Sequence, residues 1–264
     1  MQSVERNGVR LSFEEAPGAT DPVVLIHGWC CDHNYFAPQF EHFAKKGRRV
    51  VALDLRGHGA SDKPVERYSM PGFADDVAFV CDHLGLRKAL VIGHSMGGIV
   101  AFDFASRYPA LVSALVMLDA AVALPATSRA VIPKFLAELG GPDYQRAIRT
   151  FVAGTLFLPT DDPDRKVRII EGMTSAPQHV ALSAYQALAD YDATKTPRVA
   201  APSLYIGANE PSPRADMTRV RELLPALAFG QTVGSGHFCQ LEVPDQVNAM
   251  IDRFLAIATG PTAP

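Results

Sequence analysis

One serine in this sequence occupies a position suited to a nucleophile. The segment Gly93-His94-Ser95-Met96-Gly97-Gly98 follows a short apolar run and precedes an amphipathic stretch. A G-x-S-x-G pattern between a buried strand and a helix is typical of a sharp turn that exposes the serine hydroxyl. We expect Ser95 to be a catalytic nucleophile. The Met96 N–H, at the start of the helix, would then stabilise a developing oxyanion.

A general base is predicted near the end of the chain. His237 lies in Gly234-Ser235-Gly236-His237-Phe238, between a strand-like run around residues 228–233 and a helical pattern over 246–255. The ordinary pKa of histidine suits proton transfer near neutral pH. The other seven of the eight histidines lie in motifs that are usually structural or on helix and loop faces. We therefore expect His237 to be the base.

The acid that would orient this base has two candidates. Glu210 follows the strand-like run 203–206, and Asp119 follows the run 114–118. Either carboxylate could hold the His237 ring and stabilise its imidazolium. The family resemblance described below implies that the position of Glu210 is the commoner one for the acid, and Glu210 keeps the order serine, acid, histidine. We keep both candidates and favour Asp119, because of a resemblance described below.

The elements that must position these residues alternate along the chain. Short apolar runs, typical of buried strands, are separated by helical patterns, and this order predicts a mostly parallel sheet covered on both faces. An edge strand is predicted after the Asn7-Gly8 turn. The predicted strands are Val9–Phe13, Val23–Ile26, Val50–Leu53, Ala89–Ile92, Ala114–Leu118, Ser203–Ile206 and residues 228–233; the helices are Tyr35–Lys46, Phe73–Leu84, Ile99–Tyr108 and Gln246–Leu255.

The alternation stops between Val122 and about Lys195. This stretch is helix-like, is broken by proline and glycine, and contains no comparable strand signal. We interpret residues 122–195 as an inserted helical cap, and residues 1–121 and 196–264 as the core domain. A cap over Ser95 that contains apolar residues such as Phe135 and Phe151 favours a substrate with an apolar or aromatic part.

Composition excludes several classes of protein. With 48% hydrophobic and 20% charged residues the 264-residue chain is not intrinsically disordered, and its formal net charge of −3 does not favour nucleic acid or an anionic membrane as partner. No apolar run reaches the roughly 18 residues of a membrane helix, and the N-terminus lacks the apolar core of a signal peptide. The four cysteines are too few for a disulfide framework and lack metal spacing. We expect a cytoplasmic enzyme that acts on a small molecule without metal or organic cofactor; its oligomeric state is open.

These motifs together resemble the α/β-hydrolase family over nearly the whole chain. His27-Gly28-Trp29 is similar to the family's oxyanion loop, so that the Trp29 N–H would be the second oxyanion donor. Residues 54–61, Asp-Leu-Arg-Gly-His-Gly-Ala-Ser, match a loop that is usually structural. The resemblance implies an eight-strand, mostly parallel sheet with helices on both faces and a helical cap. It also implies hydrolysis of a carboxylic ester or related acyl compound through an acyl-enzyme on Ser95.

A narrower resemblance leaves other activities open. Residues 27–33 and 237–245 are similar to the cofactor-free dioxygenases that open hydroxyquinolone rings, whose acid maps onto Asp119. In those enzymes the histidine deprotonates the substrate hydroxyl and oxygen attacks the carbanion. Cys31 replaces a histidine of that pattern, and the turn around Ser95 is of the common hydrolase type. A perhydrolase or haloperoxidase, or a receptor with slow turnover, could carry the same residues.

Overall fold

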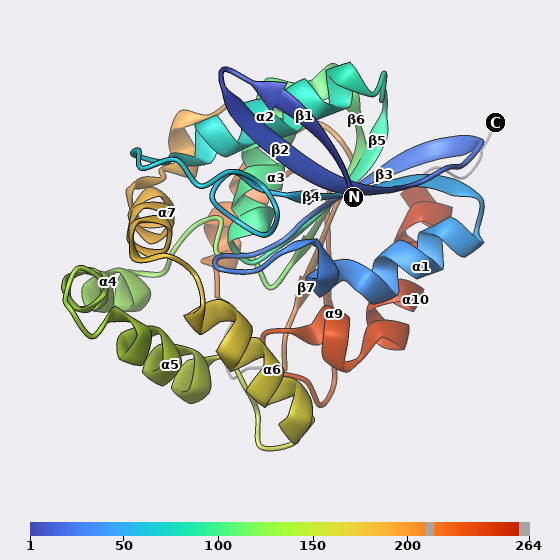
Figure 1. Cartoon of the computed structure of the whole chain (residues 1–264). Coiled ribbons are helices and arrows are strands. Elements are labelled where there is room, and N and C mark those ends of the chain that lie inside the picture. Colours follow the sequence, from blue (N-terminus) through green and yellow to red (C-terminus); the bar gives the residue numbers. More distant parts are fainter. Residues whose placement is uncertain (210–213, 259–264) are drawn as a thin grey trace.

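The computed structural model describes residues 1–209 and 214–258 of the chain. Within these residues eight strands form a single sheet in the order β1-β2-β4-β3-β5-β6-β7-β8 (Figure 1). All neighbours from β4 to β8 pair in parallel, whereas β2 pairs antiparallel with both β1 and β4. The predicted fold is therefore confirmed. The strands are β1 (Gln2–Arg6), β2 (Val9–Ala16), β3 (Thr20–Ile26), β4 (Arg48–Asp54), β5 (Ala89–His94), β6 (Val112–Leu118), β7 (Ser203–Gly207) and β8 (Leu227–Gln231).

The first two strands correct the prediction in one respect. They form a hairpin in which Arg6 pairs with Val9, and Asn7 and Gly8 between them have φ angles of 53° and 77°. A two-residue turn of this type needs positive φ at both positions, which explains the Asn-Gly pair. The strand before the turn was not predicted, because its side chains are mostly exposed and give no apolar run. Since β1 pairs with the outer side of β2, β2 is not the edge strand that the sequence suggested.

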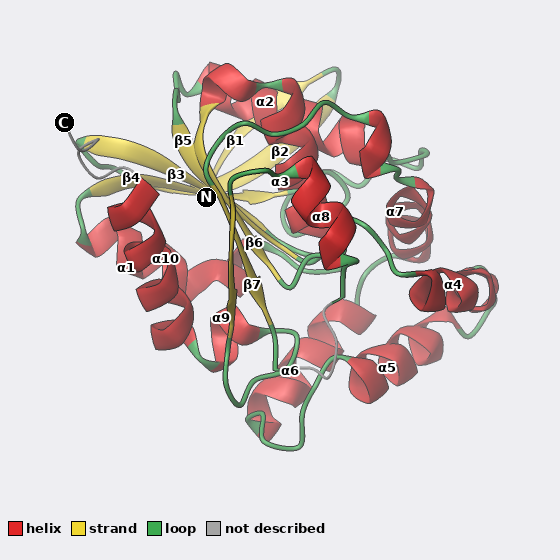
Figure 2. Ribbon diagram, turned by 180° about the vertical axis from the view of Figure 1, so that it is seen from behind, coloured by secondary structure: helices red, strands yellow, loops and turns green. Residues whose placement is uncertain are grey.

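Helices cover both faces of the sheet (Figures 1 and 2). Val24 and Ile26 of β3 face the apolar core that contains α2 and α3, whereas Val23 and Leu25 face the core with α1 and α10. A strand buried on both faces reads as an uninterrupted apolar run, which is why the central strands were recognisable. The helices of the two faces are α2 (Met70–His83), α3 (Met96–Arg107) and α8 (Met217–Leu223) on one, and α1 (Ala37–Lys45), α9 (Cys239–Glu242) and α10 (Pro244–Ala258) on the other.

Four helices lie together to one side of the sheet, between β6 and β7 in the sequence (Figures 1 and 2). Residues 122–195, all of them described, contain these helices, one 3₁₀ turn and no strand. Most of their buried apolar side chains belong to the same cluster as those of α2 and α3. The division into a core and a cap stays an interpretation, and "cap" is used below for residues 122–195. The helices are α4 (Ala126–Leu139), α5 (Tyr144–Thr155), α6 (Pro163–Thr174) and α7 (Gln178–Asp190).

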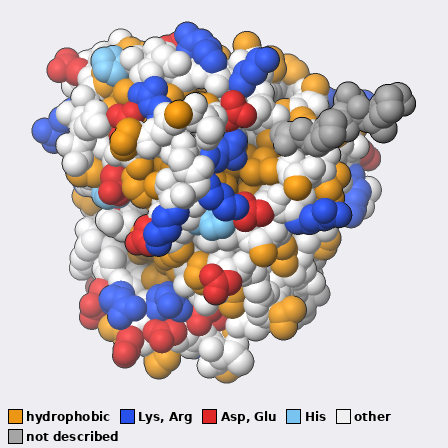
Figure 3. All heavy atoms as spheres, turned by 90° about the vertical axis from the view of Figure 1, so that its right-hand side faces the viewer, with side chains coloured by type: hydrophobic (Ala, Val, Ile, Leu, Met, Phe, Trp, Pro, Cys, Tyr) orange, Lys and Arg blue, Asp and Glu red, His pale blue; other side chains and the backbone are white. Residues whose placement is uncertain are grey.

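Charges of both signs lie side by side on the face of the molecule shown in Figure 3. On the face shown in Figure 3, Lys and Arg side chains are interspersed with Asp and Glu, and hydrophobic atoms lie between them. Among the described helices, none has the length and apolar character needed to cross a membrane.

Candidate active site

Strained backbone conformations occur at the carboxyl ends of three neighbouring strands of the sheet. Of the five described non-glycine residues with positive φ, three are Cys30, Ser95 and Asp119. They lie just beyond β3, β5 and β6, whose carboxyl ends are neighbours in the sheet. Such conformations cost about 1–3 kcal/mol each and cluster at functional sites. The strain therefore marks this edge as the candidate site.

Ser95 occupies the tight turn that the sequence predicted. It has φ 55° and ψ −120°, and α3 begins at the next residue. The turn lies so close to β3 that a β-carbon on Gly97 would be 2.1 Å from the Ile26 carbonyl oxygen, so only glycine fits there. Gly28 also lies close to Ser95, since a β-carbon on Gly28 would be 3.2 Å from Ser95 Cβ. The candidate nucleophile and the candidate oxyanion loop are thus in contact.

Two backbone N–H groups are available beside Ser95. Met96 is the first residue of α3, so its N–H has no acceptor within the helix. Trp29 follows Gly28 in a turn closed by a hydrogen bond from the Cys31 N–H to the Gly28 carbonyl at 3.3 Å. In the described part of the chain neither the Trp29 nor the Met96 N–H donates a hydrogen bond. That these two groups form an oxyanion hole stays a prediction.

The structure brings His237 together with Asp119. His237 Nδ1 lies 2.6 Å from Asp119 Oδ2, and both side chains are buried. The other carboxylate oxygen, Oδ1, accepts the Ala208 N–H at 3.1 Å. Because β6 and β7 are neighbours, a carboxylate after β6 reaches the loop that follows β7. Glu210, the other candidate acid, lies outside the described residues.

The charges of this pair follow from their surroundings. Burial alone would raise the pKa of Asp119, but the hydrogen bond from His237 and the charges of His237 and Arg214 outweigh it and lower the pKa to about 2. Burial lowers the pKa of His237 below its usual range, and the charge of Arg214 lowers it further against the opposing effect of Asp119. At neutral pH the site therefore holds an ionised Asp119 and a neutral His237, the state required of a base.

The backbone around His237 is held from two sides. On the core side, His94 Nε2 donates to the His237 carbonyl at 2.9 Å. On the cap side, the His237 N–H donates to the Leu156 carbonyl at 3.0 Å, and the Gly236 N–H donates to the buried Asp161 carboxylate at 2.9 Å. The segment between α5 and α6 thus helps to fix the loop that carries the candidate base.

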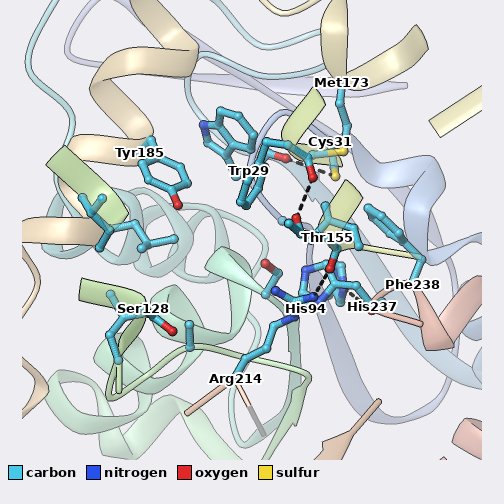
Figure 4. A pocket seen from close by; sticks show the side chains of 18 of the residues that line it. Trp29, Cys31, His94, Ser128, Thr155, Met173, Tyr185, Arg214, His237 and Phe238 are labelled. Atoms are coloured by element: carbon cyan, nitrogen blue, oxygen red, sulfur yellow. Dashed lines mark hydrogen bonds between the residues drawn. The ribbon is translucent and has the colours of Figure 1, made fainter. Parts of the chain in front are cut away.

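A cavity of about 220 Å³ opens above Ser95 and His237 (Figure 4). One wall comes from strand ends and the other from cap helices. Trp29 joins the two walls: its indole N–H donates to the Ala181 carbonyl of α7 at 2.9 Å, and its ring meets Tyr185 edge-on at 5.2 Å. The cap contributes the lining residues Leu124, Ser128, Val131, Ile132, Phe151, Thr155, Leu156, Met173, Tyr185 and Leu188.

Comparison with known proteins decides the family. The sequence model of the family described as alpha/beta hydrolase fold matches residues 21–244. The chain belongs to the α/β-hydrolase fold family. It is an enzyme of the hydrolase type, as predicted.

This α/β hydrolase has relatives of several kinds. It is 28% identical to the AB hydrolase superfamily protein YisY of Bacillus subtilis, over 92% of this chain and 94% of that protein. A local match of 37% identity to the bifunctional esterase/perhydrolase DCH of Acinetobacter calcoaceticus covers 39% of this chain and 38% of that one. A thermophilic esterase from Thermogutta terrifontis has the same fold, with a TM-score of 0.84 and 24% identity over 98% of this chain and 99% of that chain.

Sequence reasoning missed part of the site of this α/β hydrolase. Arg214 donates from Nε to Asp119 Oδ2 at 2.9 Å and lines the cavity, although no motif surrounds it in the sequence. Tyr185 directs its hydroxyl into the cavity from α7 (Figure 4). Ser128 lines the cavity from α4. Nothing in the spacing of these residues distinguished them from other polar residues of a helical segment or loop.

The described residues contain no cluster of three or more His, Cys, Asp or Glu side chains that could hold a metal ion. The four cysteines are all buried and unbridged.

Proposed function

We propose that this enzyme hydrolyses a carboxylic ester, or a related acyl compound, through an acyl-enzyme on Ser95. The observation that carries the proposal is the 2.6 Å contact between His237 Nδ1 and Asp119 Oδ2, beside a cavity that both His237 and Ser95 line. A carboxylate bound to Nδ1–H leaves Nε2 as the proton acceptor of a neutral imidazole.

The reaction would proceed in two steps. His237 Nε2 takes the proton of the Ser95 hydroxyl as its oxygen attacks the carbonyl carbon, and later gives that proton to the leaving alcohol. Water then attacks the acyl-enzyme with the same base. Asp119 stabilises the transient imidazolium, and the N–H groups of Trp29 and Met96 stabilise the oxyanion.

The cavity supports a substrate with an apolar or aromatic part. Phe151 and Tyr185 line it, and their rings meet that of Trp29 edge-on at centroid distances of 6.3 and 5.2 Å. Such a wall can accept another ring in stacked or edge-on contact. The local similarity to a protein described as an esterase/perhydrolase agrees with acyl chemistry.

A fluorophosphonate probe tests the proposal directly. The wild-type protein should be labelled, and mass spectrometry should find the label on the peptide that contains Ser95. Ser95→Ala should abolish labelling. Ser128→Ala, which removes another hydroxyl of the cavity, should leave it intact. Absence of the label from Ser95 in the folded wild-type protein would remove the acyl-enzyme from the mechanism.

Cofactor-free dioxygenation is the second candidate, because the pairing of His237 with Asp119 fits this reaction as well as ester hydrolysis. The acid of the hydroxyquinolone dioxygenases resembled above follows the same strand. In that reaction His237 would deprotonate the substrate hydroxyl and Ser95 would not be acylated. Oxygen uptake with a hydroxyquinolone in metal-free buffer, retained in Ser95→Ala, would replace the esterase proposal. Peroxide-dependent acyl transfer would instead indicate a perhydrolase, and tight ligand binding with negligible turnover a receptor.

A further inference from the structure

Arg214 contacts the same carboxylate oxygen as His237. Its Nε lies 2.9 Å from Asp119 Oδ2, and its Nη2 donates to the Thr155 carbonyl at 2.8 Å. Thr155 is the last residue of α5, so the guanidinium bridges the cap and the candidate acid. In Figure 4 the side chain points toward His94 and His237. A cation placed here acts on the acid and the base together.

The sign of that action follows from the geometry. An anionic Asp119 next to Nδ1 favours the protonated, cationic form of His237. A guanidinium on the same oxygen offsets this charge and lies close to the imidazole, so it favours the neutral form. Consistent with this, the charge of Arg214 is second only to burial among the factors that lower the pKa of His237.

We propose that Arg214 is a positioning residue of the active site: it holds the Asp119 carboxylate for His237 and offsets its charge, so that His237 remains a neutral base in mildly acidic solution. The effect on turnover rests on the proposed function, because it requires His237 to act as a base. The effect on the charge of His237 does not require any particular reaction.

Charged and titratable side chains face His237 from several of the described elements around it. Asp119 follows β6, Arg214 precedes α8, and His94 ends β5 with its ring centroid 4.6 Å from that of His237. Burial, followed by the charge of His237, holds the pKa of His94 well below its ordinary value, so His94 is neutral over the range of interest. Among these groups, Arg214 is the cation whose removal should change the titration of His237.

The pH dependence of kcat/KM for a short-chain aryl ester tests the proposal. In Arg214→Gln the acid limb of this profile should move to higher pH by about one unit, because removal of a like charge beside the imidazolium favours the protonated ring. The ratio of kcat/KM at pH 8 to that at pH 6 should therefore rise, with about tenfold as the upper limit for a shift of one unit. Arg214→Lys, which keeps the charge, should leave the limb near its wild-type position even if kcat falls. Arg219→Gln removes an exposed cation of α8 paired with Glu222 and should change neither quantity.

An NMR titration of the His237 ring gives a second readout that needs no substrate. Its pKa should rise in Arg214→Gln and stay near the wild-type value in Arg214→Lys and Arg219→Gln. An acid limb and a ring titration that both stay within about 0.2 units of wild type in Arg214→Gln would overturn the proposal, whatever happens to kcat or Tm. If that variant does not fold, Arg214→Met takes its place with the same expectation. A wild type without esterase activity would contradict the proposed function and leave the titration decisive.

Discussion

The two walls of the cavity are built in different ways. The wall of strand ends carries Ser95, the Trp29 and Met96 N–H groups and Asp119, each fixed by a strained turn or a helix start. The cap wall consists of side chains from four separate helices, and those that line the cavity are mainly apolar or aromatic. The first wall fixes the positions of individual reactive atoms, whereas the second provides an apolar surface against which a substrate can pack.

Because of this difference, we expect the wall of strand ends to determine the reaction and the cap wall to determine which substrate binds. A turn as close as that at Gly97 tolerates no β-carbon, so its geometry is tied to the residue types of a few adjacent positions. The cap wall depends on how helices pack, and volume-conserving changes among apolar residues are tolerated there at small cost. Substitutions in the first wall should therefore abolish turnover, and substitutions in the second should alter substrate preference.

The largest effect is expected at the nucleophile. Ser95→Ala should lower kcat for a short-chain aryl ester by about 10⁴-fold or more, because nucleophile and base act as a unit. The fold should survive, since the hydroxyl faces the cavity. Ser128→Ala, the matched change in the cap wall, should retain most activity. Steady-state kinetics compares the two, and near-normal turnover in Ser95→Ala would exclude Ser95 from the reaction.

The acid is expected to come next. Asp119→Asn keeps the size of the side chain but loses the charge that holds His237 in the required tautomer, so kcat should fall by about 10⁴-fold. Glu210→Gln is the matched change at the other candidate and should cost little. The reverse result, a large loss only in Glu210→Gln, would reassign the acid. Small losses in both variants would mean that His237 works without either carboxylate.

The sequence predicted the first wall far better than the second. Ser95 and Gly97 are adjacent in the chain, and local sterics dictate their types, so the motif is readable. The choice between Asp119 and Glu210 could not be made from the sequence. Because β6 and β7 are neighbours, a carboxylate after either strand could reach His237. Arg214 was missed for a related reason: its bond to Asp119 spans 95 residues and leaves no local pattern.

Cap residues could be predicted only as a group. The apolar residues of a helical stretch include some that fill the core between the cap helices and others that line the cavity. Phe135 packs against Trp29 without lining the cavity, whereas Phe151 does both. The distinction depends on the crossing of α4, α5 and α7, which no local window of sequence contains.

A moderate effect is expected where the two walls join, at Asp161. Its two carboxylate oxygens accept the N–H groups of Gly236 and Leu158, at 2.9 and 2.8 Å. In Asp161→Asn one of these N–H groups would face an amide NH₂ instead of an acceptor, which should displace the His237 loop. Displacement of a catalytic group by about 1 Å can lower the reaction rate by about 100-fold, so we expect kcat to fall by about 10- to 100-fold.

Asp164→Asn is the control for this change, because Asp164 is an exposed carboxylate on the neighbouring α6. Its kinetic constants should match those of the wild type. If Asp161→Asn left kcat unchanged while lowering Tm, the junction would stabilise the fold without positioning the base, and the two walls would be more independent than the hydrogen bonds indicate.

The smallest effect is expected within the cap wall, at Phe151. Phe151→Leu keeps most of the apolar volume but loses the ring that meets Trp29 edge-on at 6.3 Å. An aromatic contact contributes about 0.5–1.5 kcal/mol, so KM for an aryl ester should rise by about 2- to 10-fold with little change in kcat. The KM for an alkyl ester of the same acid should change less.

Val131→Ala is the control for this change, because Val131 is a largely exposed residue of α4 that also lines the cavity. It should alter neither kcat nor KM appreciably. Equal increases for both esters would show that the wall recognises apolar surface without preference for a ring, and a fall in kcat as large as the rise in KM would show that even this wall positions the reacting atoms.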